Sequence, residues 1–287
     1  ALGLYWLLPL AWAPGGAMEE GHVQAGGLDS RARGNDEGAM EEGLPFTLLQ
    51  YNAFKLNTRY ERLVEEVRAR EPDLLTLQEM TPCWKRVLRW ELGARYPYRY
   101  FPVGTDTGVM SRYPFVGETV CGTYSHRASE CVVTGLVQTP RGPFRLSVIH
   151  PFHPTGKRRA RSQRYMVDIL LAHPELFEGP YLLVGDFNAT PWNAQYRRLV
   201  GAYGLRNAML GNAGPRLVPG SFPSKLPWPL RIQIDHAMPS RHFAVERWQV
   251  LDNWGSDHRP VAVDLRFRPD LPTLNRHPGP AGRSPQA

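Results

Sequence analysis

The stretch YLLVGDFNATPWN, residues 181–193, starts as an apolar run and breaks at Gly185 into a polar cluster. Its first four residues are typical of a buried strand. Asp, Asn and Gly are also the residues with which a chain leaves a strand and begins a turn, so the pattern has an ordinary structural explanation. In an extended strand, however, residues two apart point to the same side, which would aim Asp186 and Asn188 at one place. The rest of the chain decides between these two interpretations.

Polar residues also mark the ends of five other predicted strands. Asn52 ends the strand 46–52, Glu79 ends 73–79 and His150 ends 144–150. Asp235 and His236 interrupt 231–238, and Asp257 and His258 stand directly before 259–267. Each residue alone could belong to a turn or a helix cap. Acids, amides and imidazoles at six strand ends are harder to attribute to turns, and open sheets usually place their sites beyond strand termini.

The predicted elements indicate an α/β domain. Strands at 46–52 and 73–79 flank a helix within 58–70, where Leu63, Val64 and Val67 recur at helical spacing. Further strands and two further helices follow. The strands are expected at 98–101, 108–111, 115–121, 131–138, 144–150, 231–238, 243–250 and 259–267, and the helices at 156–172 and 193–204. This order favours mixed sheets with helices packed on them.

Length and composition favour one large domain, because 287 residues with 42% hydrophobic content are enough for a sizeable core. The formal charge of +7 is unevenly distributed. Residues 1–43 contain seven acids and two arginines, a net charge of −5, which leaves +12 on the remainder. A body this basic favours an anionic partner such as nucleic acid, a phospholipid surface or a phosphorylated small molecule.

The two ends of the chain have compositions that differ from the body. Residues 1–14 are apolar, and we interpret them as the remnant of a membrane helix or an export signal; the alternative is an ordinary apolar segment at a chain boundary. The Gly-rich, acidic residues 15–44 read as a flexible linker, and residues 268–287 as a disordered tail. We therefore expect the folded domain to span 45–267.

The chain has three cysteines, Cys83, Cys121 and Cys131, whose spacing matches no metal site. Cys121 and Cys131 lie on consecutive predicted strands, so they could form a disulfide across a hairpin in an oxidising compartment. The alternative, that all three cysteines are buried free thiols, is equally supported by the sequence.

A site made of Glu, Asp, Asn and His without Cys suits a hard divalent cation, because Mg²⁺ prefers carboxylate and water oxygens and often binds phosphate as well. Hydrolysis of phosphate esters is the natural chemistry of such a site. The cation would polarise a phosphoryl oxygen, a carboxylate would orient water, and imidazole or amide donors would stabilise the developing charge.

Six motifs, taken in order, resemble those of the endonuclease/exonuclease/phosphatase superfamily, which includes nucleases, inositol polyphosphate phosphatases and sphingomyelinases. They are QYNAF (50–54), DLLTLQE (73–79), GVMSRYP (108–114), GDFNATP (185–191), IDHAM (234–238) and SDHRPVAVDL (256–265). The resemblance covers about residues 45–267. It implies a four-layer α/β sandwich of two packed mixed β-sheets flanked by helices.

The resemblance also assigns roles. It implies that Glu79, Asn52 and Asp257 hold Mg²⁺, or alternatively Mn²⁺. Asp186 would orient or deprotonate water, Asn188 would donate to the phosphate, and His258, oriented by Asp235, would stabilise or protonate the transition state. His150 matches a second histidine that acts near the leaving group in some nucleases; its acidic partner is left unassigned, with Glu118 and Glu130 as candidates. His236 is expected to be structural. No tyrosine matches the one that abasic-site enzymes carry, which argues against DNA repair.

Two loops bear on the substrate. Lys157, Arg158, Arg159, Arg161 and Arg164 follow His150 and could face phosphates, or equally form the solvated start of a helix. Lys225 and Trp228 precede Asp235, where the tryptophan could stack on a base, enter a membrane interface or simply pack.

The sequence therefore predicts a Mg²⁺-dependent phosphodiesterase or nuclease, monomeric, anchored or exported through its N-terminus, with its catalytic domain outside the cytoplasm. The alternative within the same chemistry is a phosphodiesterase or phosphatase acting on lipid or phosphoinositide head groups. A non-catalytic phosphate-binding module is the alternative from another class. The complete polar set argues against it, because a decayed site should have lost some members.

Overall fold

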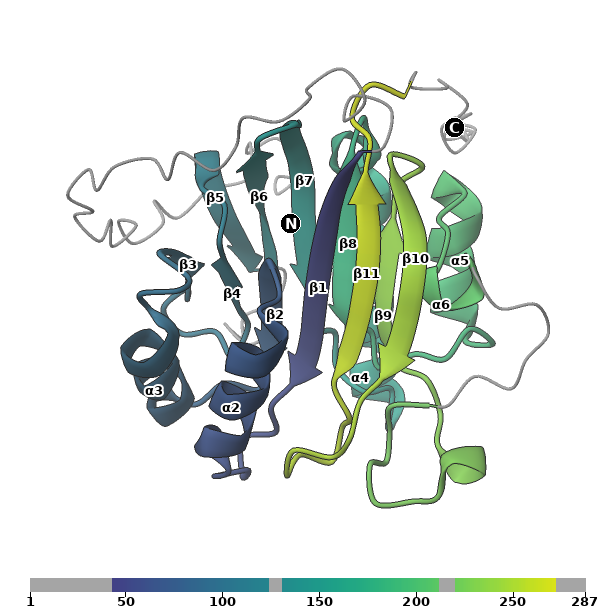
Figure 1. Ribbon diagram of the computed structural model, residues 1–287. Coiled ribbons are helices and arrows are strands. Elements are labelled where there is room, and N and C mark those ends of the chain that lie inside the picture. Colours follow the sequence, from purple (N-terminus) through teal and green to yellow (C-terminus); the bar gives the residue numbers. More distant parts are fainter. Residues whose placement is uncertain (1–42, 124–130, 212–219, 272–287) are drawn as a thin grey trace, which may run out of the picture.

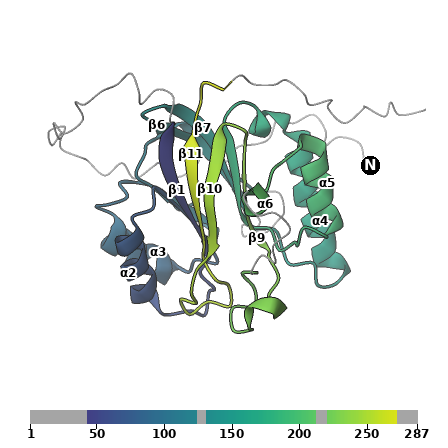
Figure 2. The ribbon, with the colours of Figure 1, turned by 45° about the vertical axis from the view of Figure 1, so that its right-hand side comes forward.

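The computed structural model describes residues 43–123, 131–211 and 220–271. The predicted segments 1–14, 15–44 and 268–287 fall almost entirely outside these residues. Two β-sheets pack face to face, with helices on both outer faces (Figures 1 and 2). This arrangement confirms the four-layer α/β sandwich that the motifs imply.

The first sheet has six strands in the order β10-β11-β1-β2-β4-β3, and the second has five in the order β5-β6-β7-β8-β9. Both sheets mix parallel and antiparallel pairs, since β1 is parallel to β2 and β7 is parallel to β8. The strands are β1 Leu44–Asn52, β2 Leu74–Gln78, β3 Tyr98–Tyr100, β4 Gly108–Ser111, β5 Phe115–Thr123, β6 Cys131–Thr139, β7 Gly142–Ile149, β8 Tyr181–Asp186, β9 Asp235–Pro239, β10 Phe243–Val250 and β11 Val261–Phe267.

Helices cover the outer faces, α2 and α3 over the first sheet and α4 and α5 over the second (Figure 2). The helices are α2 Tyr60–Arg70, α3 Pro82–Leu92, α4 Lys157–Ala172, α5 Ala194–Tyr203 and α6 Ala208–Gly211, with 3-10 turns η1 Pro174–Phe177 and η2 Trp228–Leu230. Within the described residues, no helix combines the length and the apolar character needed to cross a bilayer.

Three apolar cores lie between these four layers. The central core joins the two sheets and includes a cluster of aromatic rings, among them Phe46, Phe144 and Phe243. The second core packs α2 and α3 on the first sheet through Leu63, Trp84 and other side chains, and the third packs α4 and α5 on the second sheet. Burial on both faces explains why β8 begins as a continuous apolar run and why β2 is rich in leucine.

The strand ends that carry the predicted site residues meet at one edge of the sandwich, the lower edge of Figure 1. In the first sheet Asn52 lies opposite Gln78, at the ends of β1 and β2. In the second sheet Asp186 lies opposite Asp235, where β8 ends and β9 begins. A hydrogen bond from Asn52 Nδ2 to Asp186 Oδ2 (3.0 Å) joins the two sheets at this edge.

One prediction about strands needs correction. The strand predicted at 231–238 begins only at Asp235, because Ile232 instead pairs with Phe222 in an isolated bridge of the preceding loop. Asp235 therefore opens β9 rather than interrupting a strand.

In the β5–β6 hairpin, Cys131 lies opposite Thr123 and Cys121 opposite Val133. The side chains of both cysteines lie outside the described residues, so their pairing stays a prediction.

Gly185 is required by the close approach of β7 and β8. It has φ 145°, and a Cβ atom placed there would lie 2.0 Å from the backbone oxygen of Ile149. Gly185→Ala should therefore lower the free energy of unfolding by roughly 3 kcal/mol or more, because backbone must move in the centre of the sheet. Gly201→Ala is the control: Gly201 is helical, has open space at its Cβ, and should gain roughly 0.5–1 kcal/mol. Equal denaturation midpoints for parent and Gly185→Ala would contradict this account.

Candidate active site

Asp186 is the central carboxylate of the site and is 1% exposed. Its Oδ2 atom accepts hydrogen bonds from Nδ2 of Asn52 (3.0 Å) and Nδ2 of Asn188 (3.2 Å), and its Oδ1 accepts from the backbone N–H of Asn188 (2.8 Å). Asn188 has φ 47°, which makes a turn directly after β8. This turn, and not the alternation of side chains along a strand, brings Asn188 to Asp186. Phe187 packs in the core on the other side.

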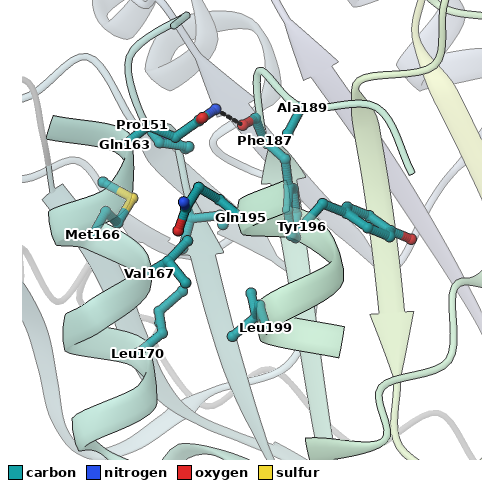
Figure 3. A pocket seen from close by; sticks show the side chains of 11 residues that line it. Pro151, Gln163, Met166, Val167, Leu170, Phe187, Ala189, Gln195, Tyr196 and Leu199 are labelled. Carbon is teal, nitrogen blue, oxygen red and sulfur yellow. Dashed lines mark hydrogen bonds between the residues drawn. The ribbon is translucent and has the colours of Figure 1, made fainter. Parts of the chain in front are cut away.

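The loop that carries Asn188 is fixed by helix α4. Gln163 Nε2 donates to the backbone oxygens of Phe187 (3.3 Å) and Asn188 (3.0 Å), the first of these drawn in Figure 3. Asn188 Nδ2 also donates to the Pro151 oxygen (3.0 Å), so both of its amide hydrogens have acceptors. The pocket in Figure 3 lies behind this loop and is lined mostly by apolar side chains of α4 and α5, so it lacks the groups that hydrolysis requires.

An aspartate–histidine pair approaches Asp186 from the loop before β11. His258 Nδ1 lies 2.8 Å from Asp235 Oδ2, and His258 Nε2 lies 3.7 Å from Asp186 Oδ2. Asp235 is held in turn by the Ser221 hydroxyl (2.6 Å to Oδ2) and by Gln50 Nε2 (3.4 Å to Oδ1). The imidazole is therefore oriented with Nε2 toward the central carboxylate.

A second aspartate–histidine pair approaches Asp186 from the end of β7. His150 Nδ1 lies 3.4 Å from Asp106 Oδ1, and His150 Nε2 lies 3.7 Å from Asp186 Oδ2. Asp106 was not predicted; the side chains of the candidates Glu118 and Glu130 lie outside the described residues. The loop of Asp106 is anchored by its backbone oxygen, which accepts from the N–H of Met80 (2.8 Å).

Burial and charge set the ionisation of these groups. Burial alone lowers the pKa of His258, but Asp235 and Asp186 outweigh it and raise that pKa to about 10. For His150 burial also lowers the pKa, and Asp106 with Asp186 raises it to about 9. Burial raises the pKa of Asp186, which makes this carboxylate a stronger base. Both imidazoles are thus cationic at neutral pH beside one basic carboxylate.

Glu79, Asn52 and Asp257 form the other side of the site. Asn52 Nδ2 lies 3.4 Å from Glu79 Oε1, and the Lys55 N–H donates to Glu79 Oε2 at 3.3 Å. Burial raises the pKa of Asp257, His258 opposes this, and Glu79 adds repulsion. Among the described residues, neither carboxylate forms an ion pair with lysine or arginine. Two half-buried acids without a lysine or arginine partner, one of them in contact with the Asn52 amide, are a donor set that suits a hard divalent cation.

Asp186, Asp235 and His258 also bring one potential ligand atom each within 4.8 Å of one another. This second set suits a cation less well than the first. Asp235 Oδ2 already accepts from both His258 and Ser221, so the oxygen that this set would offer to a cation is engaged in two hydrogen bonds.

Several buried polar residues that support the site were not predicted. Gln50, Thr76 and Gln78 are fully buried between the sheets, and the Thr76 hydroxyl donates to Gln50 Oε1 at 2.5 Å. Ser256 Oγ donates to the backbone oxygen of Asn52 (2.7 Å) and accepts from the His258 N–H (3.0 Å), which links the two halves of the site.

His236 has the structural place that the sequence suggests. It is buried, its Nε2 lies 2.8 Å from the backbone oxygen of Ala189, and its Nδ1 lies 2.8 Å from Asn207 Nδ2. Burial lowers its pKa to about 4, so it is neutral and faces away from the site residues.

The predicted substrate-binding residues lie around the site but do not contact its carboxylates. Lys157, Arg158, Arg159, Arg161 and Arg164 are exposed along the first turns of α4. Arg159 approaches His153, whose pKa is lowered by burial and by Arg159 and raised by Glu79, so this end of α4 borders the metal side. Trp228 is 45% exposed on η2, in the loop whose Phe222 ring lies 4.8 Å from the His258 ring.

Comparisons with known proteins agree with this arrangement. A model of the Endonuclease/Exonuclease/phosphatase family matches residues 49–258. None of the curated proteins matches the chain significantly in sequence.

Solved structures with the same fold have diverse activities. An endonuclease/exonuclease/phosphatase from Beutenbergia cavernae is 21% identical with a TM-score of 0.64, over 78% of this chain and 72% of that one. A mannosyl-6-phosphatase from Bacteroides thetaiotaomicron is 20% identical with a TM-score of 0.61, over 77% and 100%. Sphingomyelinase C from Streptomyces griseocarneus is 16% identical with a TM-score of 0.53, over 77% and 99%. At these identities the likeness shows the fold alone. The family match, which spans most of the chain and every predicted catalytic and metal residue, shows that the protein belongs to the endonuclease/exonuclease/phosphatase family.

Proposed function

We propose that the protein is a divalent-metal-dependent phosphodiesterase. The observation that carries this proposal is the approach of two cationic imidazoles to one buried, basic carboxylate, Asp186, beside two acids that have no lysine or arginine partner among the described residues. Such an arrangement places two proton donors within a few ångströms of one base. It suits attack of water on a phosphorus atom better than it suits passive binding of phosphate.

In the proposed reaction Asp186 accepts the proton of the attacking water. His258 and His150 each direct Nε2 toward Asp186 at 3.7 Å, too far for a hydrogen bond, so both N–H groups are available to phosphoryl oxygens. His258, supported by Asp235, would stabilise the charge that develops at phosphorus. His150 would donate its Nε2 proton to the leaving oxygen. Donation from Asn188 would require it to exchange one of its present acceptors.

A divalent cation, Mg²⁺ or Mn²⁺, would be held by Glu79, Asn52 and Asp257 and would supply polarisation of the phosphoryl group. Three features of this chain support the proposal: the acids lack lysine or arginine partners among the described residues, Asn52 bridges Glu79 and Asp186, and both acids are only partly buried. We further propose that the domain acts outside the cytoplasm, on the basis of the apolar residues 1–14.

Hydrolysis of bis-p-nitrophenyl phosphate with Mg²⁺, with Mn²⁺ or with chelator tests the proposal. Activity should need a divalent cation. Glu79→Gln, which removes charge but little volume, should raise the cation concentration for half-maximal activity by roughly tenfold or more, while thermal unfolding without metal stays parental. Metal-independent hydrolysis, or an unchanged cation requirement in Glu79→Gln, would contradict the assignment. Asp252→Asn is the control, because Asp252 is exposed on the neighbouring loop.

A further inference from the structure

Exposed apolar side chains gather at the edge of the sandwich that carries the site. Of the eleven large hydrophobic residues that are exposed in the described part of the chain, seven lie on loops at this edge. Leu56 (73% exposed), Val103 (94%) and Trp192 (75%) belong to three separate loops, and the other four lie within residues 226–232. We call this set the apolar rim: Leu56, Val103, Trp192 and the apolar residues of 226–232.

The rim residues lie close to the catalytic groups in the chain. Leu56 follows β1 and its Asn52, Trp192 follows β8 and Asn188, and Val103 is in the loop that delivers Asp106. The 220–234 loop is tied to the site by the Ser221–Asp235 hydrogen bond and, with the loop after β1, projects at the lower edge of Figure 1. Scattered exposed hydrophobics need no explanation, but their concentration on the loops of one edge marks a contact surface.

The charges among these loops are mostly positive. Lys55 and Lys225 lie in the same loops as Leu56 and Trp228, and the exposed cations at the start of α4 border the site through Arg159 and His153. The corresponding loops at 53–59, 101–107, 151–156, 187–193, 220–234 and 251–260 contain one acid of the exposed class, Asp252. The loops at the site edge therefore present apolar and cationic side chains together.

This combination favours an anionic lipid surface over nucleic acid. Single strands are bound by aromatic platforms on which bases stack, together with cations. The rim has two tryptophans, but its remaining members are Leu, Val and Ile, which offer no π face to a base. Aliphatic side chains and tryptophan beside cations are what an interfacial membrane contact requires.

We propose that the apolar rim docks on an anionic phospholipid bilayer and holds the catalytic residues against the head groups. The docking does not depend on the reaction. That the hydrolysed ester belongs to a phospholipid head group rests on the proposed function.

Flotation with vesicles in chelator tests the docking separately from catalysis. The parent protein should partition onto vesicles of phosphatidylcholine with phosphatidylserine. The double variant Trp192→Ser/Leu230→Ser should have a partition coefficient lower by roughly tenfold or more, because two large apolar side chains no longer leave water on binding. Trp90→Ser is the matched control, since Trp90 is 86% exposed on α3, away from the rim, and it should partition like the parent. All three proteins should hydrolyse bis-p-nitrophenyl phosphate alike. Leu56→Ser, on another loop, provides a second rim variant if the first is poorly folded.

A charge variant separates the two parts of the contact. Arg158→Gln/Arg161→Gln should weaken partition onto anionic vesicles by roughly tenfold or more and leave binding to pure phosphatidylcholine unchanged, since each cation near an anionic surface contributes on the order of 1 kcal/mol. Parental partition of both rim variants, or no partition of the parent, would overturn the docking. Weakened binding of single-stranded DNA in the rim variants with vesicle binding absent would assign the rim to nucleic acid. Docking without hydrolysis of any phosphate ester would overturn the proposed function and leave the docking in place.

Discussion

Asp186→Asn should lower kcat on a soluble phosphodiester by about 10³-fold or more. The substitution keeps the size of the side chain and removes the base, whose catalytic contribution is on the order of 10²–10⁴-fold, together with the charge that the two imidazoles face. Steady-state hydrolysis of bis-p-nitrophenyl phosphate at saturating metal measures the loss. Binding of substrate should change less than turnover, because the proton is transferred only in the transition state.

The stability of the same variant distinguishes catalysis from folding. Asp186 is buried, and burial raises its pKa, so an amide in its place removes an unfavourable buried charge. The Asn188 N–H can still donate to the side-chain oxygen, whereas the new amide nitrogen cannot accept from Nδ2 of Asn52 and Asn188. The free energy of unfolding of Asp186→Asn should therefore fall by roughly 1–3 kcal/mol, a loss that leaves the protein folded at the assay temperature, and Asp252→Asn should keep both stability and turnover. Turnover of folded Asp186→Asn within about tenfold of the parent would exclude Asp186 as the base.

The fold was predictable because its strands and most of its helices have clear periodicity. Buried strands such as β8 read as apolar runs, and the helix at 157–172 follows a glycine with apolar residues at helical spacing. Helix α3 was not predicted, although Trp84, Leu88 and Leu92 recur every four residues after Thr81, whose hydroxyl accepts from the Trp84 N–H at 3.3 Å. Its three basic residues, Lys85, Arg86 and Arg89, and the exposed Trp90 obscured that pattern.

The site was predictable only where a residue ends a strand within a recognisable motif. Asp106 lies in a loop 44 residues from His150, and only the antiparallel pairing of β2 with β4 brings that loop to the site edge. Gln50 and Gln78 read as ordinary polar residues of a strand, because nothing local shows that both faces of β1 and β2 are covered. Such supporting contacts depend on the packing of two sheets and are not visible in local sequence.

The substitutions Asp235→Asn and His258→Ala should act as one unit. His258→Ala should lower kcat by about 10³-fold, since it removes a donor to the phosphate, and Asp235→Asn by about 10²-fold, since it removes the charge that keeps the imidazole protonated and oriented. The double variant should be little worse than His258→Ala, because an aspartate that acts only through the histidine has no further role once that histidine is gone. Initial rates of the four proteins at saturating metal complete the cycle.

His150 and Asp106 provide the comparison that makes this cycle informative. The Asp106–His150 contact is longer, 3.4 Å against 2.8 Å, and less buried, so its coupling should be weaker than that of Asp235 with His258. The two pairs approach Asp186 from different elements and share only that carboxylate. Losses from His150→Ala and His258→Ala should therefore multiply if the histidines serve different oxygens of the phosphate. Multiplicative losses within the Asp235–His258 cycle would instead show that Asp235 acts independently of His258, and a direct role of its carboxylate, including ligation of a cation with Asp186, would then replace the positioning role.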